Sequence, residues 1–173
     1  MNGKTRRLTL WGLMTAISLA LSVAESAIVP AALFPVPGFR LGFANIAILI
    51  SVYIFGAFPS IGIVLIRTLS VFAFSGNPTV FLFSLCGGLA AVSVMLALHR
   101  IRRFSIFGVS AGGAAAHSVG QIAVAIPIAG NVSVIGYLPA LLWASIAAGL
   151  LIALISVPVY RAVVTFFRFR PGQ

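Results

Sequence analysis

Acidic residues are almost missing from this sequence. It contains no aspartate, and Glu25 is the only glutamate among its 173 residues. Sites that bind Mg²⁺ and diphosphate use several carboxylate ligands, so this scarcity excludes most of them. Glu25 itself lies within an apolar stretch. An ionised group in a membrane is costly unless it faces a cavity or a cationic partner, which makes Glu25 the first candidate for a functional residue.

Cysteine and the common catalytic motifs are also scarce or missing. Cys86 is the single cysteine, so the chain cannot form an internal disulfide or a thiolate–metal cluster. The sequence contains no His-Glu-x-x-His, Gly-x-Ser-x-Gly or aspartate-rich diphosphate motif. We therefore expect no enzymatic activity, no bound metal and no cofactor.

Charged residues of either sign are few. They make up 7% of the sequence, against 61% hydrophobic residues, and the mean hydropathy is +1.20. A soluble domain has about 25% charged residues, so this composition predicts an integral membrane protein. The net charge of +10 comes from short basic clusters between apolar runs rather than from one basic face, which argues against a nucleic-acid partner. Such clusters are typical of membrane anchors beside anionic lipid headgroups.

Glycine, proline and charged residues divide the sequence into apolar segments of the length that a membrane-spanning helix needs. Proline and glycine at 56–59 and at 76–78 predict tight turns between neighbouring helices. We predict an all-α integral membrane protein in which residues 1–173 form a single domain, a bundle of six transmembrane helices. The expected helices are Leu8–Val29, Leu41–Ala57, Pro59–Ser75, Thr79–Leu98, Ser105–Pro127 and Ile135–Val159.

The distribution of basic residues predicts the orientation of this bundle in the cell (inner) membrane. With both termini in the cytoplasm, all eleven basic residues except Arg40 and Arg67 fall in cytoplasmic segments or at their edges. Positive charge is enriched on that side of membrane proteins, so this topology is favoured. The first external connection, Ser26–Arg40, is apolar and rich in proline. It is either a lid over a binding site or an interfacial segment resting on headgroups.

Polar residues within the predicted spans gather at the midplane or in the outer half. This asymmetry predicts a pocket that opens to the outside. Each residue also has a structural alternative: the amides can bridge or cap helices, the histidine can be an interior group, and Arg67 can exist to pair with Glu25. The candidate substrate-binding residues are Glu25, Arg40, Asn45, Arg67, Asn77, His117 and Gln121.

The candidate pocket carries about one surplus positive charge, since it contains two arginines and one carboxylate. The planar fork of a guanidinium suits carboxylate and phosphate groups. We therefore expect a ligand that is anionic or rich in hydrogen-bond acceptors.

The first helix carries a ridge of small residues at four-residue spacing: Gly12, Ala16, Ala20 and Ala24. Small residues let helices approach closely in lipid, where packing drives association. The ridge serves either packing within the bundle or docking of another membrane subunit.

Several motifs together resemble a known family. They are Glu25-Ser26, Pro37-Gly38-Phe39-Arg40-Leu41-Gly42-Phe43-Ala44-Asn45, Arg67, Gly87-Gly88, Gly112-Gly113-Ala114, His117-Ser118-Val119-Gly120-Gln121 and Tyr137-Leu138-Pro139. From about Leu8 to about Leu154 the chain resembles the Gx transporter family, whose members often carry the older label heptaprenyl diphosphate synthase component I. Relatives commonly have asparagine where this chain has Ser118, so details of the pocket are expected to differ.

That family is similar to the S components of energy-coupling factor transporters, which are six-helix membrane proteins. The resemblance implies capture of a vitamin-like compound, or of an isoprenoid or quinone precursor, beneath the loop 26–40. It also implies docking of the small-residue ridge on a transmembrane coupling subunit, with separate ATPase subunits supplying energy. The alternative is a non-catalytic membrane accessory subunit of heptaprenyl diphosphate synthase or quinone biosynthesis. A stand-alone secondary transporter is disfavoured, because ion coupling usually needs carboxylates reachable from both sides.

Overall fold

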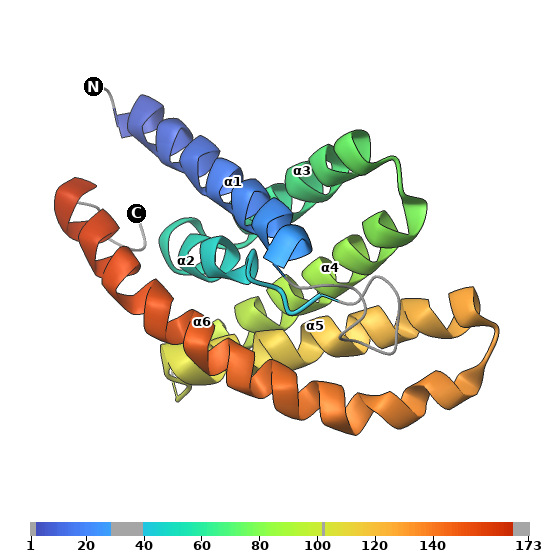
Figure 1. Ribbon diagram of the computed structural model, residues 1–173. Helices are drawn as coiled ribbons and strands as arrows, with labels where there is room; N and C mark the ends of the chain where they lie inside the picture. Colours follow the sequence, from blue (N-terminus) through green and yellow to red (C-terminus); the bar gives the residue numbers. More distant parts are fainter. Residues whose placement is uncertain (1–2, 29–39, 102, 168–173) are drawn as a thin grey trace.

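The computed structural model describes residues 3–28, 40–101 and 103–167, and these residues are almost entirely helical. Figure 1 shows long helices packed into one bundle, with a short helix, α2, enclosed among them. In chain order the elements are α1 (Gly3–Ile28), α2 (Asn45–Phe55), α3 (Ala57–Ser75), α4 (Pro78–Arg100), α5 (Ile106–Ala129), the 3₁₀ helix η2 (Val132–Tyr137) and α6 (Leu138–Phe167).

The prediction of six helices in an all-α membrane protein is confirmed, and the length of the second helix is corrected. Five helices are long and apolar enough to cross a membrane, so the chain is a multi-pass membrane protein. α2 has 11 residues, which at 1.5 Å per residue is about 16 Å, against a hydrocarbon core of about 30 Å. Most of its residues are buried, so α2 is a core helix that the other helices surround.

The prediction that the second helix begins at Leu41 is wrong for a local reason. Gly42 has φ +87°, a left-handed conformation that glycine adopts readily and that an α-helix excludes. Its amide and that of Phe43 donate to the carboxylate of Glu25. The helix therefore begins at Asn45, whose amide donates to the carbonyl of Gly42 at 2.8 Å.

Both predicted turns are confirmed. Gly56, with φ +82°, separates α2 from α3, and Pro59 lies in the first turn of α3, where its missing N–H costs nothing. Between α3 and α4, Gly76 has φ +61° and ends α3. Asn77 then caps α4 by accepting from the amides of Thr79 and Val80.

Small residues set the contact between α5 and its two neighbours. A Cβ added to Gly120 would lie 2.7 Å from the carbonyl oxygen of Cys86 in α4. A Cβ added to Gly149 in α6 would lie 2.8 Å from Cα of Ala111. In addition, the hydroxyl of Ser110 donates to the carbonyl of Gly149 at 2.6 Å. α4, α5 and α6 thus pack backbone against backbone, as helices in lipid commonly do.

The helix ends gather in two groups. Rings of Tyr53, His99 and Tyr160 lie together near the ends of α2, α4 and α6, with centroids 4.3 Å and 5.8 Å from that of Tyr53. α1 and α3 meet at the same end of α2, where Nε1 of Trp11 in α1 donates to the carbonyl of Pro59 in the first turn of α3. In Figure 1 the start of α1 and the end of α6 both lie toward the left. Glu25 and Arg40 lie toward the other end of the bundle. Glu25 is near the end of α1, and Arg40 begins the segment 40–44 that leads into α2, here called the approach to α2.

Candidate functional site

Glu25 is buried, 3% exposed, and its carboxylate holds the start of α2. Oε1 accepts from the amide of Gly42 at 2.7 Å, and Oε2 accepts from the amide of Phe43 at 3.2 Å. Nε of Arg40 lies 4.0 Å from Oε2 and forms an ion pair with it. The lone carboxylate is thus enclosed by two amides and one guanidinium, which together meet the cost of its burial.

Arg40 is the most fully bonded cation of the site. Its Nη1 donates to the hydroxyl of Ser84 in α4 at 3.2 Å. Its Nη2 donates to the carbonyl of Ser22 and, at 2.6 Å, to the hydroxyl of Ser26, both in α1. Burial lowers the pKa of Arg40 below its ordinary value, and the negative charge of Glu25 opposes that shift. Arg40 therefore ties α1 to α4 across the approach to α2.

Gln121 and His117 extend the cluster into α5. The hydrogen-bond network fixes the orientation of the Gln121 carboxamide, since oxygen and nitrogen are otherwise interchangeable. In that orientation its oxygen accepts from Nε2 of His117 at 3.2 Å and from the amide of Arg40 at 3.1 Å. Its nitrogen donates to the carbonyl of Arg40 at 3.2 Å. His117 and Gln121, one turn apart on α5, therefore hold the backbone of Arg40 before α2.

Asn45 lies beside this network without joining it. Its side chain is fully buried at the first position of α2. Neither its oxygen nor its nitrogen has a hydrogen-bond partner among the described residues. A Cβ added to Gly42 would lie 2.7 Å from Nδ2 of Asn45 and 3.5 Å from Cδ2 of His117. A buried, unsatisfied amide costs about 1–3 kcal/mol, and this carboxamide keeps an unused donor and acceptor.

Arg67 is a buried cation without a carboxylate partner in the part of the chain that the structure describes. It lies in the middle of α3 and is 2% exposed. Nη2 donates to the carbonyl of Ser84 at 3.4 Å, and Nε has no hydrogen-bond partner there. Glu25, the only acidic side chain of the sequence, pairs with Arg40 instead. The surplus positive charge expected from the sequence therefore resides at Arg67.

Two adjacent glycines make room for this arrangement, and they give a direct test of it. A Cβ on Gly88 would lie 2.8 Å from Cγ1 of Val64 and 2.9 Å from Nη2 of Arg67. A Cβ on Gly87 would lie 2.8 Å from Cε1 of His117. Gly88→Ala is therefore expected to lower the free energy of unfolding by about 1–3 kcal/mol through overpacking. Thermal unfolding in detergent measures the loss.

The matched control is Gly136→Ala in η2, where an added Cβ meets no atom within 4 Å. The stability of this variant should stay within about 0.5 kcal/mol of the starting protein, as for most surface substitutions. Equal stability of the two alanine variants would contradict the tight packing of α4 against Arg67.

The remaining predicted residues lie outside the cluster. Asn77 is exposed and caps α4, so the structure does not bring it to the other candidates. Most of the predicted lid, residues 29–39, lies outside the described residues. Gly12, Ala16 and Ala20 face outward from the bundle, and Ala24 is half-buried. The ridge is therefore not used for packing inside the described bundle, since the buried face of α1 carries larger and polar residues.

Serine residues of the cluster were missed at the sequence level. Ser84 accepts from Arg40 through its hydroxyl and from Arg67 through its carbonyl, so both guanidinium groups converge on it. The carbonyl of Ser22 and the hydroxyl of Ser26 accept from Nη2 of Arg40. Serine is common in apolar helices, and the sequence does not indicate which residue its hydroxyl will contact. The four-residue spacing of Ser22 and Ser26, on either side of Glu25, is only a weak indication that they share a helix face.

Comparison with known proteins gives one match. The family model described as heptaprenyl diphosphate synthase component I matches residues 14–158. Neither a curated protein nor a solved structure matches the chain. The matched range contains every residue of the buried cluster, from Ser22 to Gln121.

Proposed function

We propose that this chain, which belongs to the heptaprenyl diphosphate synthase component I family, is a substrate-binding membrane subunit of a transporter. Its ligand is a small anionic compound that is vitamin-like or is an isoprenoid or quinone precursor. The observation that carries this proposal is Arg67, a buried guanidinium that has no carboxylate partner among the described residues and that, like Arg40, donates to Ser84.

A buried cation without a counter-ion is costly, because the charge loses its hydration without gaining a partner. Chains retain such groups mainly where function needs them. A carboxylate or phosphate on Arg67 would supply the missing charge, and Asn45, whose side chain has no partner among the described residues, offers a further donor and acceptor. In this proposal the approach to α2 covers the site. It is held there by the contacts of Arg40, Glu25, His117 and Gln121.

The same residues support a binding role over catalysis. Prenyl elongation needs Mg²⁺ held by several carboxylates. The sequence offers one acidic side chain, and Arg40 and two backbone amides already engage it. We therefore propose that the chain is no enzyme and that separate ATPase subunits energise transport. We propose that the termini and the basic clusters lie in the cytoplasm, as the distribution of basic residues predicts, so that the site faces outward.

The outward face of α1 is proposed as the docking surface for a transmembrane coupling subunit. Gly12, Ala16 and Ala20 are exposed there, and small residues permit close helix contact. Ala20→Leu is expected to reduce co-purification of that subunit at least tenfold, because a bulky side chain separates the two helices. Quantitative mass spectrometry of the purified complex measures the ratio.

Ala147→Leu on the exposed surface of α6 is the matched control, with the same added volume on a different helix. Both variants should unfold at the temperature of the starting protein. Loss of the partner in both variants, or in neither, would contradict docking through α1.

The family description supports a second candidate function. A membrane accessory subunit of heptaprenyl diphosphate synthase would dock a soluble synthase and need no small-molecule site. The buried charge of Arg67 is then unexplained, which is why this candidate ranks second.

Affinity purification from native membranes separates the two candidates. The transporter subunit should bring down a membrane coupling subunit together with ATPases. Recovery of a soluble prenyl synthase without an ATPase would support the accessory role and overturn the first proposal. A thermal-shift screen of the purified chain against flavins, naphthoates, vitamins and isoprenoid phosphates then identifies the ligand class, and stabilisation by cationic compounds alone would refute the anion site.

A further inference from the structure

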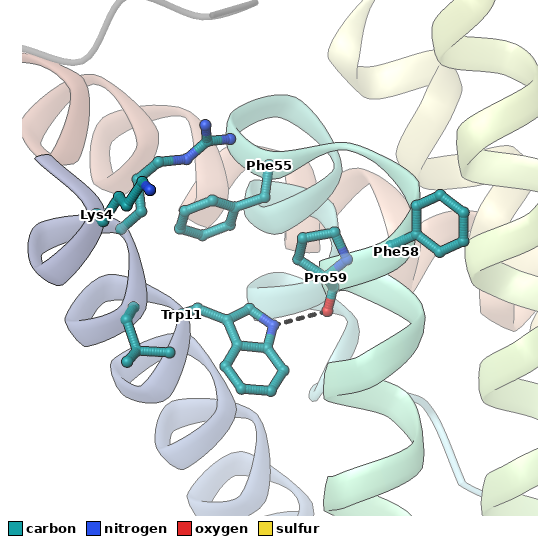
Figure 2. A pocket seen from close by; sticks show the side chains of 7 residues that line it. Lys4, Trp11, Phe55, Phe58 and Pro59 are labelled. Atoms are coloured by element: carbon teal, nitrogen blue, oxygen red, sulfur yellow. Dashed lines mark hydrogen bonds between the residues drawn. The ribbon is translucent and has the colours of Figure 1, made fainter.

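A hollow lies at the start of α1, whereas the buried cluster lies at the end of that helix. It is a cavity of about 430 Å³, open to the surface, between the first turns of α1 and the turn from α2 to α3. Figure 2 shows Lys4 and Trp11 on one side, with Phe55, Phe58 and Pro59 on the other. Arg7 and Leu8 complete the lining. None of these residues belongs to the site described above.

The lining separates charge from apolar surface. Lys4 and Arg7 lie one turn apart at the start of α1 and carry the positive charge. Leu8 and Trp11 follow at helical spacing on the same face, and Phe55 lies across from them. Nε1 of Trp11 already donates to the carbonyl of Pro59 at 2.8 Å, so its indole contributes apolar surface to the cavity. The cavity is therefore cationic at its rim and apolar at its wall.

The position of this cavity along α1 matches the membrane surface. α1 has 26 residues, about 39 Å at 1.5 Å per residue, and exceeds the hydrocarbon core by roughly 9 Å. Its first turns thus reach the headgroup level. Leu8 is 66% exposed and Phe58 is 90% exposed, so the cavity borders surface that lies in lipid. An occupant that fits needs a negative head and a hydrocarbon tail.

We propose that this cavity binds one anionic phospholipid from the surrounding leaflet. Its phosphate lies between Lys4 and Arg7, and the first part of an acyl chain lies along Leu8, Trp11 and Phe55. Juxtamembrane basic residues each favour anionic lipid, and two on one wall of an apolar cavity select one molecule rather than a diffuse layer. The expected preference over a zwitterionic lipid is about tenfold.

Tryptophan fluorescence tests this directly, because the chain has two tryptophans and one of them lines the cavity. The full chain with Trp143→Phe is placed in phosphatidylcholine vesicles, and phosphatidylglycerol brominated near its carbonyl end is titrated in. Trp11 should be half-quenched at about one tenth of the mole fraction that brominated phosphatidylcholine requires. The converse protein, Trp11→Phe, reports Trp143, which is 75% exposed on α6 and should respond equally to both lipids.

Charge variants complete the test. Lys4→Gln with Arg7→Gln should remove the preference of Trp11 for the anionic lipid. The matched control is Arg100→Gln with Arg103→Gln, which removes the same charge from exposed residues outside the cavity and should leave the preference intact. Equal quenching of Trp11 by the two lipids, or equal loss of the preference in both double variants, would overturn the proposal. Equal quenching would show that Trp11 meets no selected anionic lipid, and equal loss in both double variants would assign the preference to diffuse surface charge.

Discussion

Arg67→Met is expected to raise the stability of the unliganded protein and to abolish its stabilisation by anionic compounds. Methionine fills a similar volume with apolar atoms, so the variant removes an unpaired buried charge without opening a large cavity. Replacing buried charge by apolar groups is often neutral or stabilising, and the expected gain is about 1–3 kcal/mol. Thermal unfolding in one detergent, with and without the anionic compounds of the ligand screen, measures both effects.

Arg40→Met is the matched control, with the same substitution in the same cluster and the opposite expected sign. Arg40 pairs with Glu25 and donates to Ser22, Ser26 and Ser84. Its loss leaves the carboxylate buried without a cation, at a cost of about 3–5 kcal/mol. If Arg67→Met destabilised the protein as much as Arg40→Met, Arg67 would be a structural residue. The anion site would then be refuted, whatever partner the chain recruits.

The helices could be predicted because glycine, proline and charged residues occur at or near their ends. The turn at Gly76 and the cap at Asn77 are local features, readable from adjacent residues. The start of α2 could not be read in this way. The apolar pattern continues through Leu41 and Phe43, but Gly42 adopts φ +87°, and its amide and that of Phe43 donate to Glu25, which is distant in the sequence. A tertiary contact thus decides where this helix begins.

Much of the buried cluster was predictable for a different reason. Polar groups at similar depth in apolar helices must find one another, since lipid offers no partners. This logic brought Glu25, Arg40, His117 and Gln121 together correctly. It could not choose between Arg40 and Arg67 as the partner of Glu25, because both lie at a suitable depth. That choice depends on the segment before α2, where Gly42 and Phe43 already fix the carboxylate.

The same reasoning grouped Asn77 with the buried residues, whereas the structure shows it as an exposed helix cap. Its depth suggested a place in the pocket, but an asparagine directly before a proline at a helix start has a strong local use as a cap. That local bond keeps the residue exposed at the turn. Depth alone therefore predicts convergence only for residues without such a use nearby.

Glu25→Gln is the second variant with a large expected effect, a loss of about 3–5 kcal/mol in the free energy of unfolding. The neutral amide cannot pair with the charge of Arg40. Its nitrogen, placed at the site of either carboxylate oxygen, would also face an amide N–H of Gly42 or Phe43, a donor against a donor. The approach to α2 should then loosen. Hydrogen exchange of the amides at Gly42 and Phe43 measures this locally, and thermal unfolding measures the total.

The double variant Glu25→Gln with Arg40→Met isolates the ion pair from these backbone bonds. Removing both charges should cost less than the sum of the two single variants, by about 1–3 kcal/mol, because neither charge is then left alone. The loss of stability that remains reflects the weakened hydrogen bonds from the amides of Gly42 and Phe43. Strictly additive losses would show that the 4.0 Å contact between Glu25 and Arg40 contributes nothing. Glu25 would then stabilise the bundle through the backbone alone, and Arg40 would join Arg67 as a cation in need of an anion.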